Sequence, residues 1–205
     1  MELIKYRVYK FRSVKGTEWI DIDQLACFVG VNESGKTNLL LPLWKFNPAD
    51  GATSIDLLHD YPRDEYSELD GENNARKSEP FIEVLFLLDD NEVNLIEEEY
   101  QASLTTIKAE SNTEETENEH NSKSDPSPFG VTKYLLIKKD YEERFYIYLS
   151  DENGYEKSEN IENDIGDKAF EKICDFIPKF VYYSEYGNLD SDLYLPHVKQ
   201  NLDRI

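Results

Sequence analysis

One short motif predicts the fold class of this 205-residue chain: Gly30-Val31-Asn32-Glu33-Ser34-Gly35-Lys36-Thr37. It contains two glycines separated by four residues and followed by lysine and threonine. Gly30 and Gly35 allow backbone angles that other residues resist, so the loop amides can point inward and form an anion cradle. Lys36 then places a cation near the β- and γ-phosphates, and the Thr37 hydroxyl can ligate Mg²⁺. The stretch therefore predicts a site for a nucleoside triphosphate with Mg²⁺.

The segments on either side of this loop suit a phosphate-binding turn. Leu25 to Val29 is an unbroken apolar run, typical of a strand buried on both faces, and Cys27 within it is expected to be a small core residue. Lys36 to Phe46 is typical of a helix, which Pro42 is expected to kink or to end early. This order predicts an α/β fold of the P-loop NTPase class. The residues expected to bind the nucleotide are Gly30, Asn32, Glu33, Ser34, Gly35, Lys36, Thr37 and Asn38.

Further elements follow from the spacing of apolar residues. Apolar and polar residues alternate in two segments, residues 2–11 and Glu18 to Ile22. A turn at Lys15-Gly16-Thr17 separates the segments, so an antiparallel hairpin is predicted. A second hairpin is predicted from two further strand-like segments, Tyr134 to Lys138 and Phe145 to Leu149. The other expected elements are a helical piece near Ile55 to His59, a strand from Phe81 to Leu88, helices from Glu92 to Tyr100 and Asp167 to Phe176, a strand from Phe180 to Tyr183 and the start of a helix from Tyr194 to Ile205.

Composition divides the chain into an N-terminal region, an insert and a C-terminal region. Residues 1–101 form the predicted nucleotide-binding region with its hairpin. Residues 102–130 are acidic and nearly free of apolar groups, so they cannot bury enough surface to offset their loss of conformational entropy, and a disordered insert is predicted. Residues 131–205 are expected to complete an antiparallel lobe and to be truncated before a helical arm.

The overall charge restricts the expected partners. The formal net charge is −21, from 43 acidic and 22 basic residues. A surface that binds DNA usually carries a basic stripe, and no such stripe is visible, so DNA contact by this chain is not expected. The N-terminus lacks the apolar region of a signal peptide, and no apolar run approaches the roughly 20 residues of a membrane helix. A cytoplasmic location without membrane contact is therefore expected.

Two stretches resemble one protein family. The segments are Lys10-Phe11-Arg12-Ser13 and the run from Phe28 to Asn38, which contains the phosphate loop. The family that they resemble is that of ABC-class ATPase heads of the SMC, RecF and OLD type, also called AAA-15 or AAA-21 domains. The resemblance implies a mixed sheet core plus an antiparallel β lobe, with ATP and Mg²⁺ as ligands. It also implies a basic residue near the nucleotide at Arg12, for which a strand-end charge in water is the alternative.

The resemblance also implies how such a head works. Members bind ATP between two heads, one supplying the phosphate loop and the other a signature Ser-Gly segment, so a homodimer is expected. Hydrolysis also needs a Walker B Asp-Glu pair and a downstream histidine. In many members the ATPase regulates a nuclease in DNA repair or phage defence. The chain is thus expected to be the ATP-binding half of such a head, with hydrolysis only in the complete dimer.

The chain departs from the family pattern outside the phosphate loop. No signature Ser-Gly segment follows, and the apolar run from Val84 to Leu88 ends in Asp89 and Asp90, which are weak candidates for Walker B. The alternative is that both are the acidic end of a lobe strand. Two other functions stay open, a compact P-loop kinase or NTPase that uses this acidic pair, and a regulatory module that binds ATP without hydrolysis. No arginine-rich lid follows, which favours the ATPase head over a kinase.

Overall fold

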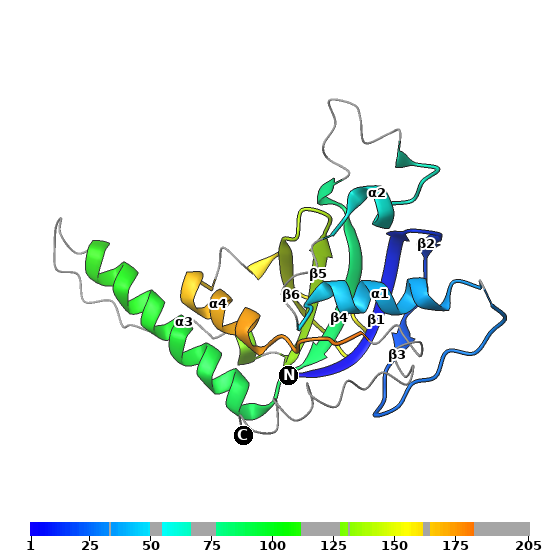
Figure 1. Ribbon diagram of the computed structural model, residues 1–205. Helices are drawn as coiled ribbons and strands as arrows, with labels where there is room; N and C mark the ends of the chain where they lie inside the picture. The colour runs from blue at the N-terminus through cyan, green and yellow to red at the C-terminus, as the bar shows by residue number, and fades with distance from the viewer. Residues whose placement is uncertain are drawn as a thin grey trace, which may run out of the picture.

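A six-stranded sheet organises the computed structural model, which describes residues 1–32, 34–49, 55–66, 77–111, 128–130, 132–161 and 165–182. The strands are β1 (Glu2–Phe11), β2 (Val14–Gly16), β3 (Ile20–Asp21), β4 (Pro80–Leu87), β5 (Tyr134–Asp140) and β6 (Phe145–Ser150). Their order is β2-β1-β4-β5-β6, with β3 also paired to β1, and each of these pairings is antiparallel (Figure 1). The helices are α1 (Lys36–Phe46), α2 (Leu57–Asp60), α3 (Asp90–Ser111) and α4 (Asp167–Phe176), and a short 3-10 helix, η3, spans Pro128–Gly130.

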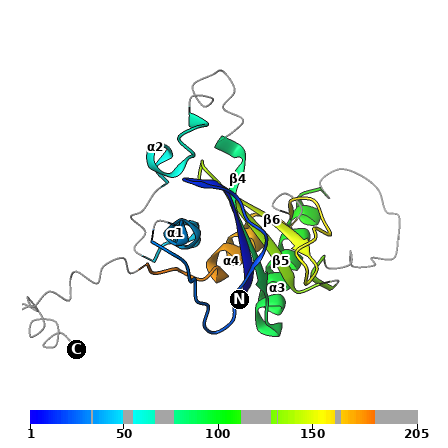
Figure 2. The ribbon, with the colours of Figure 1, turned by 90° about the vertical axis from the view of Figure 1, so that its right-hand side faces the viewer.

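One face of the sheet carries the hydrophobic core. The register places Tyr6 opposite Val84, Val84 opposite Ile137, and Ile137 opposite Ile147, and these four side chains are buried. Because side chains alternate along a strand, this row occupies one face. The helices add Leu41 and Phe46 from α1, Ile96 and Tyr100 from α3, and Ala169 and Ile173 from α4 to the same core. The view turned by 90° shows α1 on one side of the strands (Figure 2).

The opposite face carries a polar cluster around Glu83 on β4. This carboxylate is only 4% exposed and lies 2.6 Å from Arg7 Nη2 and 3.3 Å from Lys138 Nζ. The Arg7 guanidinium also lies over the Trp19 ring, 4.5 Å from its centre. The two cations compensate the buried carboxylate, whose charge would otherwise be strongly destabilising. Trp19 thereby becomes a fixed part of this sheet face.

Gly154, in the turn after β6, packs directly against Trp19. We expect Gly154→Ala to lower the free energy of unfolding by about 1–3 kcal/mol, because the added Cβ both clashes and requires an unfavourable backbone angle. The Cβ would lie 2.7 Å from Trp19 Cζ2, and φ at this residue is +81°. Urea titration of both proteins measures the change. Gly16→Ala is the matched control, since its Cβ meets nothing within 4 Å. Equal stability of wild type and Gly154→Ala would contradict this packing.

Both predicted hairpins form, but the first turns earlier than expected. The predicted turn at Lys15-Gly16-Thr17 is wrong, because Gly16 pairs with Tyr9 as part of β2. The chain instead reverses at Arg12 and Ser13, and Arg12 adopts a φ of 54°. This left-handed angle is uncommon for a residue other than glycine. It places Arg12 at the tip of the β1–β2 hairpin.

The buried strand expected from Leu25 to Val29 does not form. Leu25 is 88% exposed, Val29 is 91% exposed and Cys27 is exposed, so the expected core role of Cys27 is wrong as well. A strand requires neighbours for its backbone N–H and C=O groups. None of the described strands pairs with this segment. The parallel part of the expected mixed sheet is therefore reduced, in the described residues, to an isolated parallel bridge between Pro48 and Phe180, whereas the antiparallel lobe is present.

The predicted insert begins too early. Residues 102–111 continue α3, which packs against α4: a Cβ on Gly166, the residue before α4, would lie 3.1 Å from Ser103 Cβ. Apolar Tyr100 and Leu104, four positions apart, supply a packing face that the acidic composition concealed. Residues 112–127 and the C-terminal helix expected from Tyr194 lie outside the described residues. The other predicted helices form, and α1 runs through Pro42 without ending.

Candidate nucleotide-binding site

The phosphate loop folds at the N-terminus of α1. Gly35 is the N-cap residue, with a left-handed φ of 88° and no capping side chain. The Ser34 N–H donates to the Val31 carbonyl at 3.3 Å and closes the turn of the loop. The first N–H groups of a helix lack partners within it, and the helix dipole makes this end positive. An anion bound here would therefore meet both hydrogen-bond donors and a favourable dipole.

Lys36 folds back over the loop. Its Nζ donates to the carbonyl oxygens of Gly30 at 2.8 Å and Val31 at 2.6 Å, and lies 3.4 Å from Ser34 Oγ. Gly30 permits this approach, because a Cβ there would lie 2.9 Å from Ser34 Oγ and 3.8 Å from Lys36 Cδ. The ammonium is therefore held over the cradle on a flexible stem, from which it can turn to a phosphate group.

The loop and the first turn of α1 enclose a cavity of about 370 Å³, here called the cradle. Its lining residues are Asn32, Ser34, Gly35, Lys36, Thr37 and Asn38, all predicted from the sequence. The Thr37 hydroxyl is exposed and makes no hydrogen bond with any described residue, so it suits the predicted Mg²⁺. No group of three or more His, Cys, Asp or Glu side chains in the described part of the chain could hold a metal ion. Glu33 lies outside the described residues.

A second cavity of about 560 Å³, here called the side pocket, adjoins the cradle. It is lined by Arg12, Ser13, Asn38, His59, Tyr61, Arg63 and Asp64. Asn38 lines both cavities, and its Nδ2 donates to Ser13 Oγ at 2.7 Å, which ties the start of α1 to the tip of the β1–β2 hairpin. Small-molecule sites commonly have volumes of about 300–1,000 Å³. The two adjoining cavities are therefore large enough for a phosphate chain and a nucleoside.

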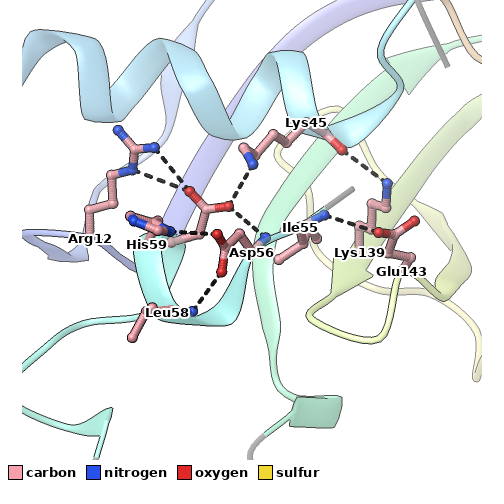
Figure 3. A network of polar contacts seen from close by, with 9 residues as sticks. Arg12, Lys45, Ile55, Asp56, Leu58, His59, Lys139 and Glu143 are labelled. Atoms are coloured by element: carbon pink, nitrogen blue, oxygen red, sulfur yellow. Dashed lines mark hydrogen bonds and ion pairs between the residues drawn. The ribbon is translucent and has the colours of Figure 1, made fainter. Parts of the chain in front are cut away.

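Buried Asp60 connects the side pocket to α1, because it pairs with both Arg12 and Lys45. Figure 3 shows Arg12 and Lys45 within this network of polar contacts. Arg12 donates to Asp60 Oδ1 through Nε at 3.2 Å and Nη2 at 3.1 Å, and Lys45 Nζ donates to Asp60 Oδ2 at 2.6 Å. The backbone N–H of Asp56 also donates to Oδ2, at 3.0 Å. Asp60 is fully buried, and a buried carboxylate is stable only when it is paired and hydrogen-bonded in this way.

The far end of α1 is also fixed. Lys139 Nζ donates to the carbonyl oxygens of Lys45 at 2.9 Å and Phe46 at 3.0 Å. Burial lowers the pKa of Lys139. These hydrogen bonds satisfy carbonyl groups that a helix C-terminus leaves without partners, and a cation there complements the helix dipole. Both ends of α1 are thus tied to the sheet and its hairpins, so the cradle has a fixed position.

The side pocket retains cationic groups in this strongly acidic chain. Arg63 is exposed and has no polar partner among the described residues. The acids nearby are already paired: a hydrogen bond from Lys15 lowers the pKa of Asp64, and one from His59 lowers the pKa of Asp56. Together with the Arg12 and Lys36 cations, this arrangement favours an anionic ligand locally, despite the net charge of −21.

The structure does not bring the candidate Walker B pair to the cradle. The Asp89 N–H donates to the Glu92 carboxylate at 2.9 Å, and the Glu92 N–H donates to the Asp89 carboxylate at 2.8 Å, which caps α3, while Asp90 forms an ion pair with Lys133. Leu87, which shortly precedes the acidic pair, lies opposite Glu2 at the start of β1. The cradle is instead tied to Ser13, which follows the last residue of β1. β1 has ten residues, so these ends lie about 30 Å apart. Asp89 and Asp90 therefore have a structural role at α3.

Sequence patterns alone did not reveal the residues that support Arg12. Asp60 belongs to the run Asp60-Tyr61-Pro62-Arg63-Asp64, in which proline and aspartate favour a turn and conceal a buried carboxylate. Lys45 did offer a signal, since a lysine between Trp44 and Phe46 in an apolar helix needs a partner when it is buried. The identity of that partner depends on contacts distant in sequence.

Comparison with protein families matches residues 1–204 to the family described as AAA ATPase domain. The chain therefore belongs to this family, and its resemblance to AAA-15-type ATPase heads is confirmed. The family assignment supports ATP binding and ATPase activity. Neither the curated proteins nor the solved structures give a match. Among the residues that the structure describes, no helix is long and apolar enough to cross a membrane.

Proposed function

We propose that this domain binds MgATP, with the phosphate chain running from the cradle to the Arg12 side of the side pocket and the nucleoside in the rest of the side pocket. The observation that carries the proposal is the phosphate loop at the N-terminus of α1, with Lys36 held over it and Asn38 joining the two cavities. The loop N–H groups and Lys36 would contact phosphate oxygens, and Thr37 would be the protein ligand of Mg²⁺. The cationic side pocket adds to the attraction for the nucleotide.

We further infer that the domain is the ATP-binding half of an ABC-class head that dimerises around ATP. Two features support this. Among the described residues, the cradle lining contains no carboxylate that could orient the attacking water. The apolar residues Leu25, Val29 and Val31 beside the phosphate loop are exposed, as expected of a segment that another part of a complete head would cover. By resemblance, the head would regulate a nuclease in DNA processing or phage defence.

The described part of the cradle lining also suits a second candidate function, a regulatory module that binds ATP without hydrolysing it, because that function requires no catalytic carboxylate. A compact P-loop enzyme is less well supported. It would need Asp89 and Asp90 at the phosphates, whereas both lie at the other end of the sheet. Turnover measurements separate these possibilities.

The isolated chain is expected to bind ATP but to release phosphate at a rate close to that without protein. Positioning and electrostatic stabilisation do nearly all the catalytic work in phosphoryl transfer, and this chain supplies only part of the required groups. Phosphate release should be measured over a range of protein concentrations, for wild type, Asp89→Asn and Asp90→Asn. Asp151→Asn is the control, since this carboxylate is paired with Lys157 and lies outside both cavities.

Three outcomes are distinguishable. Brisk turnover that is lost in Asp89→Asn or Asp90→Asn, but kept in Asp151→Asn, would favour the compact enzyme and contradict the half-head proposal. Turnover that rises more steeply than protein concentration would support a dimer of heads. Retained ATP binding without turnover, both here and in a complete head, would favour the regulatory module.

A further inference from the structure

The Asp60 carboxylate is saturated with hydrogen bonds although no bulk water reaches it. Its two oxygens accept from Arg12 Nε and Nη2, from Lys45 Nζ and from the Asp56 N–H. The side chain is fully buried, and it lies beneath the side pocket without lining it. Asp60 therefore cannot touch a ligand there directly, and any effect on binding must pass through its partners.

Arg12 is the partner that reaches the side pocket, and Asp60 holds it at two points. The Arg12 N–H donates to the Asp60 carbonyl at 2.7 Å, and its guanidinium donates to the Asp60 carboxylate. This double contact fixes the unusual φ of 54° at the hairpin tip. Both guanidinium contacts go to the single oxygen Oδ1, and the side chain remains 34% exposed. A guanidinium has five N–H donors, so donors remain for a ligand in the side pocket.

Lys45 prevents Asp60 from cancelling the charge on Arg12. Its ammonium is 7% exposed and lies 2.6 Å from Asp60 Oδ2. The two cations and one carboxylate sum to a formal charge of +1, and Arg12 is the only one of the three that lines the side pocket. Because Lys45 is on α1, the contact also fixes Arg12 relative to the helix that carries the cradle.

We propose that Asp60 is a positioning residue that presents the Arg12 guanidinium to the phosphate groups of the bound nucleotide. This role of Asp60 rests on the proposed function, and it gives a reason for nucleotide binding: the Arg12 guanidinium is oriented before the ligand arrives. Arg63, on the same pocket, has no polar partner among the described residues and is not oriented in this way. A pre-oriented arginine binds phosphate more tightly because less side-chain freedom is lost on binding.

The test is a double-mutant cycle on nucleotide affinity. Calorimetric titration with MgATP is carried out on wild type, Arg12→Ala, Asp60→Asn and the double variant. Arg12→Ala should weaken binding by about 10- to 100-fold, as expected for a charged hydrogen bond. Asp60→Asn should weaken it by about tenfold in the wild-type background and by less than about twofold when Arg12 is already alanine. Inorganic tripolyphosphate should show the same pattern, and adenosine should show no change.

Asp140→Asn is the matched control. Asp140 is also a fully buried carboxylate, paired with Arg144 at 3.0 Å in the β5–β6 turn, but it lines neither cavity. It should leave MgATP affinity unchanged. If Asp60→Asn does not fold because it strands the buried Lys45 ammonium, Asp60→Asn combined with Lys45→Met removes both charges and takes its place in the cycle.

The outcomes separate this inference from the proposed function. Equal weakening by Asp60→Asn in both backgrounds would show a general structural effect and overturn the positioning role. Loss of adenosine affinity with unchanged tripolyphosphate affinity would place Arg12 at the nucleoside and also overturn it. If the unmutated chain does not bind MgATP at all, the proposed function fails, and the role of Asp60 fails with it.

Discussion

The Lys36→Ala variant is expected to lose the rise in melting temperature that MgATP gives the unmutated domain. A ligand at about 100 times its dissociation constant stabilises a protein by about 2.7 kcal/mol, which corresponds to about 5–10 °C for a domain of this size. Lys36 supplies a charge-assisted contact to phosphate, and its loss should weaken binding about 100-fold. At the same MgATP concentration only about 0.4 kcal/mol of stabilisation then remains.

The melting temperature without ligand should change little, since Lys36 contacts only loop carbonyls and Ser34 Oγ. Lys133→Ala is the control, because this half-exposed lysine pairs with Asp90 far from the cradle and should keep the full rise. Scanning calorimetry with and without MgATP compares the three proteins. An undiminished rise in Lys36→Ala would refute the assignment of the cradle as the phosphate site.

Phe46→Ala is expected to lower the free energy of unfolding by about 3–5 kcal/mol. Phe46, at the end of α1, is completely buried, and its ring centre lies 6.0 Å from that of Phe86, 5.2 Å from that of Phe145 and 6.3 Å from that of Phe180. Truncation removes these contacts and leaves a cavity that the surrounding strands can fill only partly. Urea denaturation monitored by circular dichroism measures the loss.

Leu40→Ala is the control for the effect of Phe46→Ala on stability. Leu40 lies on the same helix but is 38% exposed, so Leu40→Ala should cost much less stability than Phe46→Ala. A loss below about 1 kcal/mol for Phe46→Ala would mean that the end of α1 is not anchored in the core. The fixed position of the cradle, which depends on that anchor, would then lose its basis.

Local sequence patterns predicted the elements whose structure depends on their own residues. The period-two alternation in residues 2–11 produced β1, and the apolar spacing of Ala169 and Ile173 produced α4 over the predicted range. The phosphate loop also followed from local sequence, because its glycines and the helix start lie within eight residues. In each case the pattern and the environment that buries it agree.

Several of the failures concern contacts distant in sequence. Leu25 to Val29 has the composition of a buried strand, but strand formation requires partner strands, and the described sheet supplies none. Asp89 and Asp90 resemble a Walker B pair in sequence, yet the antiparallel register carries them to the end of the sheet opposite the cradle. The buried charge network of Asp60 joins residues 12, 45 and 60, and no local pattern contains all three.

Calorimetric titration of the unmutated chain with MgATP tests directly whether the cradle and the side pocket form a nucleotide site. We expect saturable binding of one nucleotide per chain, competition by inorganic tripolyphosphate, and weaker binding when Mg²⁺ is withheld, because Thr37 then has no cation to share with the phosphates. Absence of saturable binding up to MgATP concentrations on the order of 1 mM, the upper end of typical enzyme affinities, would show that this domain is not an ATP-binding site.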